Sequence, residues 1–128
     1  MVVGENIESF GGRYMNTTII NVKEVIGSPS ALTREQGQLL LDEIRGVFAA
    51  GDKVIVDFAE IESMIIPFLN TAIGKLYEDN TSDMLKKNLE LQNIPKGKAA
   101  SFNLVIENAK RYYANQGKFV QTVKAVIG

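Results

Sequence analysis

The spacing of hydrophobic and polar residues predicts strands and helices that alternate along the chain. Residues 17–22 are rich in β-branched side chains, residues 53–58 form a nearly continuous apolar run, and residues 88–92 alternate, so all three segments are predicted strands. The run at 53–58 follows a predicted helix directly, which is typical of a central strand covered on both faces. Asp57 stands near the end of this strand.

Three segments have the apolar spacing of helices. The first opens at Thr33, where a glutamine three residues later completes a capping box, and Gly51 is placed to end it. The second follows Pro67, which suits the first turn of a helix, and its apolar positions form one wide face over residues 68–77. The third begins near residues 95–97, and its apolar face comprises Phe102, Val105, Ile106, Ala109 and Tyr113.

The two ends of the chain are predicted to add smaller elements. Residues 1–15 are punctuated by glycine and indicate a hairpin arm that would add an antiparallel edge to the sheet. Residues 118–128 fit a short amphipathic helix or tail better than a strand. Strands that alternate with helices predict one α/β domain over residues 1–128, with right-handed crossover connections.

Composition excludes several classes of function. The chain of 128 residues has no cysteine and no histidine, which excludes disulfides, zinc–thiolate sites, iron–sulfur clusters, Ser-His-Asp triads and histidine-ligated metals. With 14 basic and 15 acidic residues the net charge is −1, so there is no electrostatic reason to expect a nucleic acid or an acidic membrane as partner. No signal-peptide pattern and no apolar stretch of membrane-spanning length occurs, so we expect a cytoplasmic protein.

The sequence offers few candidates for catalysis. Asp57 stands where ligands collect in such sheets, but it lacks the neighbouring aspartates of a metal-binding or phospho-acceptor pocket, so we expect it to cap the following loop. Glu60 and Glu62 have no histidine, arginine or aromatic residue beside them and indicate a solvated loop. The glycines match no phosphate-binding motif. We therefore expect no enzymatic activity, no cofactor and no metal site.

The loop between the predicted central strand and the next helix is unusually apolar. Such loops are normally polar, yet Met64, Ile65 and Ile66 follow one another directly. Two interpretations stay open. Either two of the three side chains pack beneath the sheet edge, or the loop is an apolar contact surface for another protein, flanked by the following helix.

Residues 53–76 resemble the core of a STAS-like domain family of unknown function, a relative of the STAS domains of anti-sigma-factor antagonists. The shared pattern is an apolar strand ending in Asp57 and Phe58, then a loop, then a helix reading Phe-Leu-x-x-Ala-Ile-Gly-x-Leu. Residues 10–14, Phe-Gly-Gly-Arg-Tyr, are similar to the opening segment of the family. The resemblance implies a mixed β-sheet of about four strands with helices packed mainly on one side.

The resemblance also implies a bacterial regulatory module, not an enzyme, that docks a partner through the loop and helix after the central strand. In the antagonists a GHKL-type, ATP-dependent anti-sigma kinase phosphorylates a serine or threonine where that helix starts, and the added charge releases the partner. Here Ile66 occupies the acceptor position and Ile65 the preceding acidic one, so the usual phosphorylation site is lost. Ser63 and Thr71 are the nearest hydroxyls that could accept a phosphate. The implied partner-binding residues are Ser63, Met64, Ile65, Ile66, Asn70, Thr71 and Lys75.

Other classes of function stay open beside this one. Residues 64–67 would also suit a homodimer that uses the same apolar surface on both copies. A small-ligand-binding domain is a further alternative. An enzyme that works through Asp57 and the loop glutamates with a divalent metal, and a nucleic-acid-binding protein, have the least support.

Overall fold

Parallel strands lie at the centre of the structure, a computed structural model that describes the backbone of residues 16–127 and the side chains of residues 16–114. Strands β1 (Thr17–Asn21), β3 (Lys53–Asp57) and β5 (Leu89–Gln92) form one sheet in the order β1-β3-β5, and both pairings are parallel. The three strands and the central place of β3 confirm the prediction. The hairpin predicted for residues 1–15 lies outside the described residues.

A second, smaller sheet lies outside the predicted strands. Strand β2 (Ser30–Ala31) pairs in parallel with β4 (Ser63–Met64). The Ile65 amide then donates to the Ala31 carbonyl at 3.1 Å, which continues the ladder by one bond. The segment after β3 is thereby tied to the segment before the first long helix.

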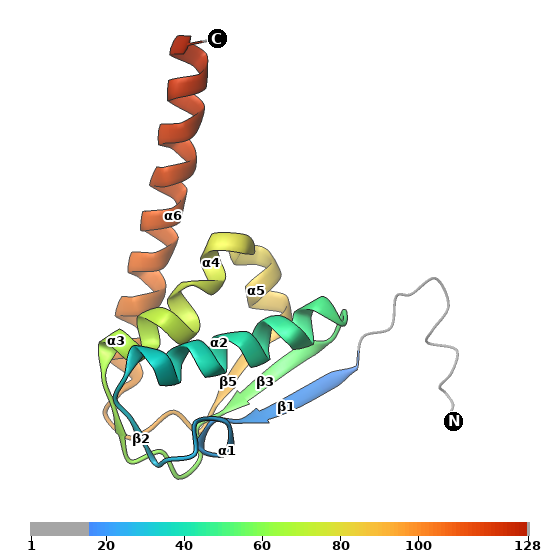
Figure 1. Cartoon of the computed structure of the whole chain (residues 1–128), viewed down its shortest axis with the longest axis vertical. Helices are drawn as coiled ribbons and strands as arrows, with labels where there is room; N and C mark the ends of the chain where they lie inside the picture. The colour runs from blue at the N-terminus through green and yellow to red at the C-terminus, as the bar shows by residue number, and fades with distance from the viewer. Residues whose placement is uncertain (1–15, 128) are drawn as a thin grey trace.

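The helices gather on one side of the three-stranded sheet (Figure 1). Their bounds are α1 (Val22–Ile26), α2 (Arg34–Ala49), α3 (Ile66–Leu69), the π-helical turn η2 (Asn70–Gly74), α4 (Leu76–Asp79), α5 (Ser82–Asn88) and α6 (Ala99–Ile127). The capping box at Thr33 is present as predicted. Helices α1 and α5 were not expected, and α6 runs unbroken through the segment predicted as a separate short helix or tail.

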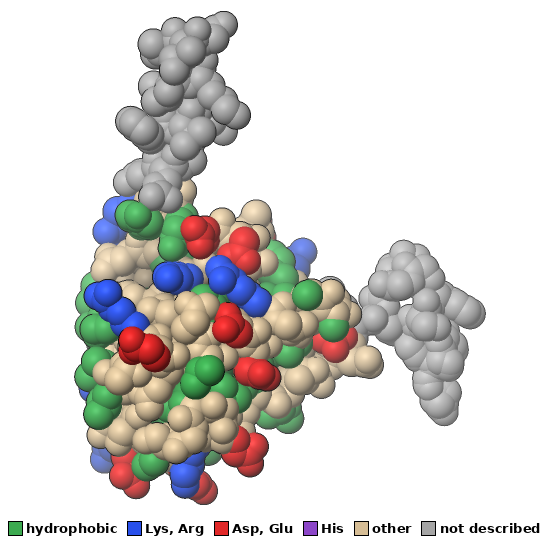
Figure 2. Space-filling view, viewed as in Figure 1, with side chains coloured by type: hydrophobic (Ala, Val, Ile, Leu, Met, Phe, Trp, Pro, Cys, Tyr) green, Lys and Arg blue, Asp and Glu red, His purple; other side chains and the backbone are tan. Residues whose placement is uncertain are grey.

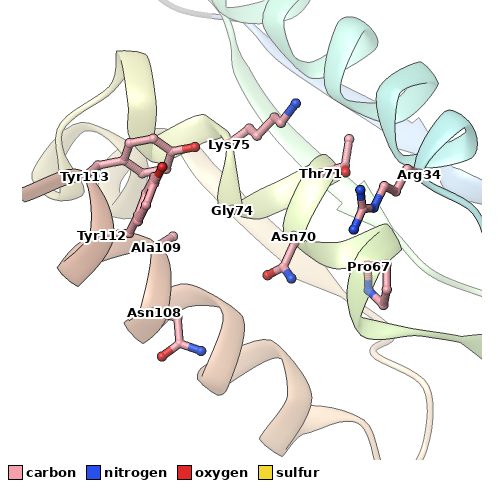
Figure 3. A pocket seen from close by; sticks show the side chains of 10 residues that line it. All are labelled: Arg34, Pro67, Asn70, Thr71, Gly74, Lys75, Asn108, Ala109, Tyr112 and Tyr113. Atoms are coloured by element: carbon pink, nitrogen blue, oxygen red, sulfur yellow. The ribbon is translucent and has the colours of Figure 1, made fainter. Parts of the chain in front are cut away.

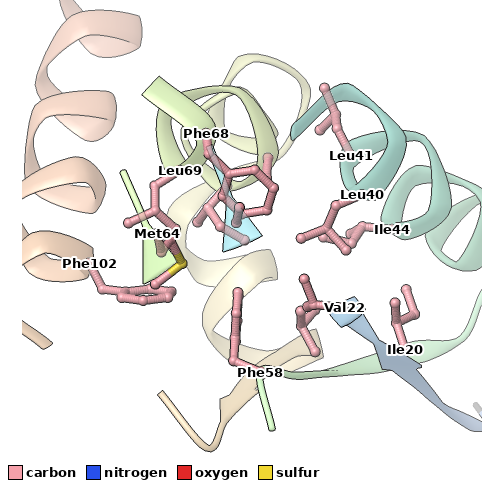
Figure 4. Close-up of a cluster of buried hydrophobic side chains, with 14 of the residues drawn as sticks. Ile20, Val22, Leu40, Leu41, Ile44, Phe58, Met64, Phe68, Leu69 and Phe102 are labelled. Atoms are coloured by element: carbon pink, nitrogen blue, oxygen red, sulfur yellow. The ribbon is translucent and has the colours of Figure 1, made fainter. Parts of the chain in front are cut away.

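The hydrophobic core fills the space between the sheet and these helices (Figure 4). Ile20, Val54 and Val56 point into it from the sheet, while Ile19 on the opposite face is exposed. On the other face of β3, Ile55 is half-buried and no described helix packs there, so the predicted helical cover on both faces is not found among the described residues. The rings of Phe58 and Phe102 meet edge to face at 5.1 Å and join the end of β3 to α6.

Candidate functional site

The loop after β3 divides its three apolar side chains between the core and the surface. Met64 is 3% exposed, whereas Ile65 and Ile66 are 39% and 37% exposed. Pairing of β4 with β2 explains why Met64 and Ile65 differ, since alternate residues of a strand point to opposite sides. Ile66 is exposed as the first residue of α3. Ser63 is exposed and Met64 enters the core. The resemblance implied that Met64 binds a partner, but the buried side chain cannot contribute to an exposed contact surface.

The predicted residues on the following helix are divided in the same way. Asn70 and Lys75 are exposed, but Thr71 is only 7% exposed. Thr71 faces α2, where a Cβ built on Gly37 would lie 3.0 Å from the Thr71 Cβ. The expectation that Thr71 lines the exposed side of the helix is wrong, because α2 packs against it. Of the two candidate phospho-acceptors, Ser63 is the exposed one.

A residue that the sequence analysis did not single out completes the exposed apolar surface. Leu32 is 46% exposed and follows β2 as Ile65 follows β4, so the parallel register places the two side by side. We call Leu32, Ile65 and Ile66 the apolar edge. Figure 2 shows hydrophobic side chains along the margin of the molecule where β4 and α3 lie. No local pattern joins Leu32 to Ile65, because only tertiary pairing brings them together.

Hydrogen bonds from Gln36 hold this surface in place. Its Oε1 accepts from the Leu32 amide at 2.7 Å and from the Thr33 amide at 3.0 Å. Its Nε2 donates to the Ser30 carbonyl at 3.1 Å. Gln36 of the capping box therefore holds β2 as well as the start of α2. Its hydrogen bonds fix the backbone that carries Leu32 of the apolar edge.

A groove of about 450 Å³ lies beside the apolar edge, between η2 and α6 (Figure 3). Among the described residues that line it, Arg34 and Lys75 are charged and none is a carboxylate. Asn70, Asn108 and Tyr112 add polar groups. A ligand in this groove would meet positive charge, amides and a phenol, so the groove is suited to a polar anion and not to a hydrocarbon.

The π-helical turn η2 shapes the groove. The Lys75 amide donates to the Asn70 carbonyl at 3.1 Å, the wide spacing that defines such a turn. π-Helical turns are rare and are found frequently at functional sites. Gly74 forms part of the groove floor: a Cβ built there would lie 3.6 Å from Val105 and 3.8 Å from Ala109.

The α6 wall of the groove carries two tyrosines in contact. The rings of Tyr112 and Tyr113 meet edge to face at 4.9 Å. Burial raises the pKa of the Tyr113 phenol, and the carboxylate of Glu78 raises it further. Tyr113 therefore stays a neutral hydroxyl at physiological pH, able to donate or accept a hydrogen bond.

Asp57 has the structural role that the sequence predicts. Its Oδ1 accepts from the Ala59 amide at 2.9 Å and from the Asn93 side-chain amide at 2.8 Å. Glu60, in the loop that follows, pairs with Lys23 at 2.8 Å on the surface. Within the described residues no group of three or more acidic, histidine or cysteine side chains is placed to hold a metal ion.

A comparison with models of protein families gives a match over part of the chain. Residues 36–97 match the family model of a STAS-like domain of unknown function. This match confirms the resemblance over residues 53–76 and the STAS-like α/β fold class. Residues 10–14 lie outside the matched range and outside the described residues. No curated protein and no solved structure matches the chain significantly. Within the described part of the chain, no helix has the length and apolar character needed to cross a membrane.

Proposed function

We propose that this STAS-like domain is a regulatory module, not an enzyme, that docks a partner protein through the apolar edge. The observation that carries the proposal is the exposure of Ile65 and Ile66, 39% and 37%, on the loop after the central strand. Leu32 extends the same surface from β2, and Asn70 and Lys75 flank it from the next helix. Apolar side chains gathered at one exposed site, with polar residues at the border, are typical of protein contact surfaces.

The partner that we propose is a GHKL-type ATPase or an anti-sigma-like kinase. The resemblance to the antagonists supports this class, because their loop and helix after the central strand dock such proteins. Ile66 and Ile65 occupy the acceptor position and the preceding acidic position, and neither side chain accepts phosphate. We therefore propose constitutive docking that phosphorylation at this position does not release.

The surroundings of Asp57 support a role without catalysis. Its carboxylate already accepts two hydrogen bonds that hold the loop after β3 and the turn after β5. Lys23 neutralises Glu60 on the surface. Asp57 thus holds the local backbone and Glu60 pairs with a neighbouring lysine, so both carboxylates already have structural partners.

The test is a pull-down from native lysate with the full chain as bait, with and without ATP, in which mass spectrometry identifies bound proteins and the mass of the bait. Ile66→Asp places a charge on the apolar edge, and Leu39→Asp makes the same change at an exposed position of α2 outside it. Circular dichroism verifies that both variants are folded. We expect the wild type and Leu39→Asp to capture an ATPase with the bait unmodified, and Ile66→Asp to lose it.

Two results would contradict the proposal. Equal capture by Ile66→Asp and the wild type would remove the apolar edge from the docking site, and a bait phosphorylated at Ser63 would contradict constitutive docking. If the wild type captures nothing but its mass in light scattering rises with concentration, and Ile66→Asp abolishes that rise, the same edge forms a homodimer instead.

A further inference from the structure

The groove between η2 and α6 gathers positive charge that no described acidic residue neutralises. Arg34 from the first turn of α2 and Lys75 after η2 both line it, and both side chains are exposed. Every ion pair among the described side chains involves other cations, namely Lys23, Arg45 and Lys110. From this groove we infer a second binding site, for a small organic phosphate monoester held by Arg34 and Lys75.

The arrangement of donors fits a phosphate group. Figure 3 shows Thr71 between Arg34 and Lys75, with both cationic side chains on the η2 side of the groove. A phosphate monoester carries nearly two negative charges at neutral pH, so it can engage a guanidinium and an ammonium together. A single carboxylate would neutralise only one of the two cations. The charge of the groove therefore favours phosphate.

The remainder of the groove fits a polar organic body. Asn70 and Asn108 line it from facing helices, and Tyr112 lines it at the α6 end (Figure 3). These groups can donate to and accept from hydroxyls of a ligand. The volume of about 450 Å³ lies in the range of small-molecule sites, and Gly74 and Ala109 keep the floor free of bulky side chains.

The π-helical turn supplies an independent reason to look here. Such a turn forgoes the regular hydrogen-bond ladder of an α-helix, and it is found frequently at functional sites. In this chain η2 contributes Asn70, Thr71 and Gly74 to the groove, and Lys75 follows it directly. The π-helical turn and the positive charges of Arg34 and Lys75 are therefore found at the same groove.

The test is titration of the full chain with ribose 5-phosphate, inorganic phosphate and ribose, followed by isothermal calorimetry and by NMR of the backbone amides. We expect ribose 5-phosphate to bind more tightly than inorganic phosphate, and ribose not to bind. Arg34→Gln and Lys75→Gln should each weaken ribose 5-phosphate binding by about tenfold or more, since each removes a charge-assisted hydrogen bond. Amide shifts should concentrate in residues 70–75 and 108–112.

Control variants separate a built site from general attraction of anions. Lys96→Gln removes the same charge from an exposed lysine that does not line the groove, and it should leave the affinity unchanged. Ile66→Asp should keep ribose 5-phosphate binding within about twofold even if it abolishes partner docking, so the two proposals can fail separately. Circular dichroism verifies the fold of each variant.

Three outcomes would overturn the inference. Equal weakening by Lys96→Gln and Lys75→Gln would show diffuse charge and no site. Absence of binding by both phosphates would remove phosphate as the ligand. Binding of a phosphoserine peptide through Arg34 and Lys75, with no binding of ribose 5-phosphate, would assign the groove to a phosphorylated protein.

Discussion

Gly37 of α2 lies against the carbonyl oxygen of Phe68 in α3. A Cβ built at position 37 would stand 2.7 Å from that oxygen, closer than side chains and carbonyls approach in practice. Helix α2 can therefore cross α3 and η2 at this separation only because residue 37 has no side chain. The contact fixes the helical segment that carries Asn70 and Lys75, and the exposed Ile66 at its start.

The first prediction compares Gly37 with Gly46, the two glycines inside α2. Gly46→Ala should raise the free energy of unfolding by about 0.5–1 kcal/mol, because alanine favours the helix and a Cβ there meets nothing within 4 Å. Gly37→Ala should lower it by about 1–3 kcal/mol, because the helices must separate. Urea denaturation of both variants measures the difference. Equal stabilisation by the two alanines would mean that α2 and α3 can move apart at Phe68 without a loss of stability.

The second prediction concerns the division of the apolar loop. Met64→Asp should lower the free energy of unfolding by at least about 3 kcal/mol, because it places a carboxylate in the core. Ile66→Asp should lower it by less than about 1 kcal/mol, since that side chain is already exposed to water. Denaturant midpoints of the two variants measure both effects. A large loss of stability in Ile66→Asp would show that the apolar edge belongs to the core.

The third prediction concerns Asp57. Asp57→Ala leaves the Ala59 amide and the Asn93 side chain without their acceptor, so we expect a loss of about 1–3 kcal/mol in the free energy of unfolding. Magnesium should leave the unfolding midpoint of the wild type unchanged. A midpoint that rises with magnesium in the wild type but not in Asp57→Ala would instead support metal-dependent chemistry at the end of β3.

The fourth prediction concerns the surface pair of Lys23 and Glu60. The hydrogen bond from Lys23, and then its charge, hold the pKa of the Glu60 carboxyl below its ordinary value. The stabilising effect of the pair is therefore present above the unfolded pKa of the glutamate and is lost as the pH falls through the lower folded pKa. NMR titration should show the Glu60 pKa rising in Lys23→Ala, and in wild type at high salt. An unchanged pKa in Lys23→Ala would assign the shift to another cause.

The longer elements are predictable from the sequence because their signals are local. The β-branched run of β1, the apolar run of β3 and the Thr33 capping box each act within a few residues. The two-residue strands β2 and β4 carry no such signal, since neither exists without the other. The lack of described helices on the second face of β3 was not predicted, because an apolar run does not reveal whether a second layer of helices follows.

The candidate site was predictable only in part, for the same reason. The resemblance places the surface on the loop and helix after β3, and Ile65, Ile66, Asn70 and Lys75 are exposed there. The burial of Met64 depends on the register with β2, and that of Thr71 depends on the approach of α2 at Gly37. The groove could not be predicted from local sequence patterns, because its lining residues come from elements that are far apart in the sequence, including α2, η2 and α6.

The parallel pairing of every described strand has a consequence for how the chain folds. Each register pair joins residues more than 30 positions apart, such as Thr17 with Lys53 and Ser30 with Ser63. Parallel strands cannot be closed by a tight turn, so long loops must close before the sheets gain any stability. Leu32 and Ile65 consequently become neighbours only after such a closure. A partner that recognises both side chains together would distinguish a completely folded copy from a nascent or partly unfolded one.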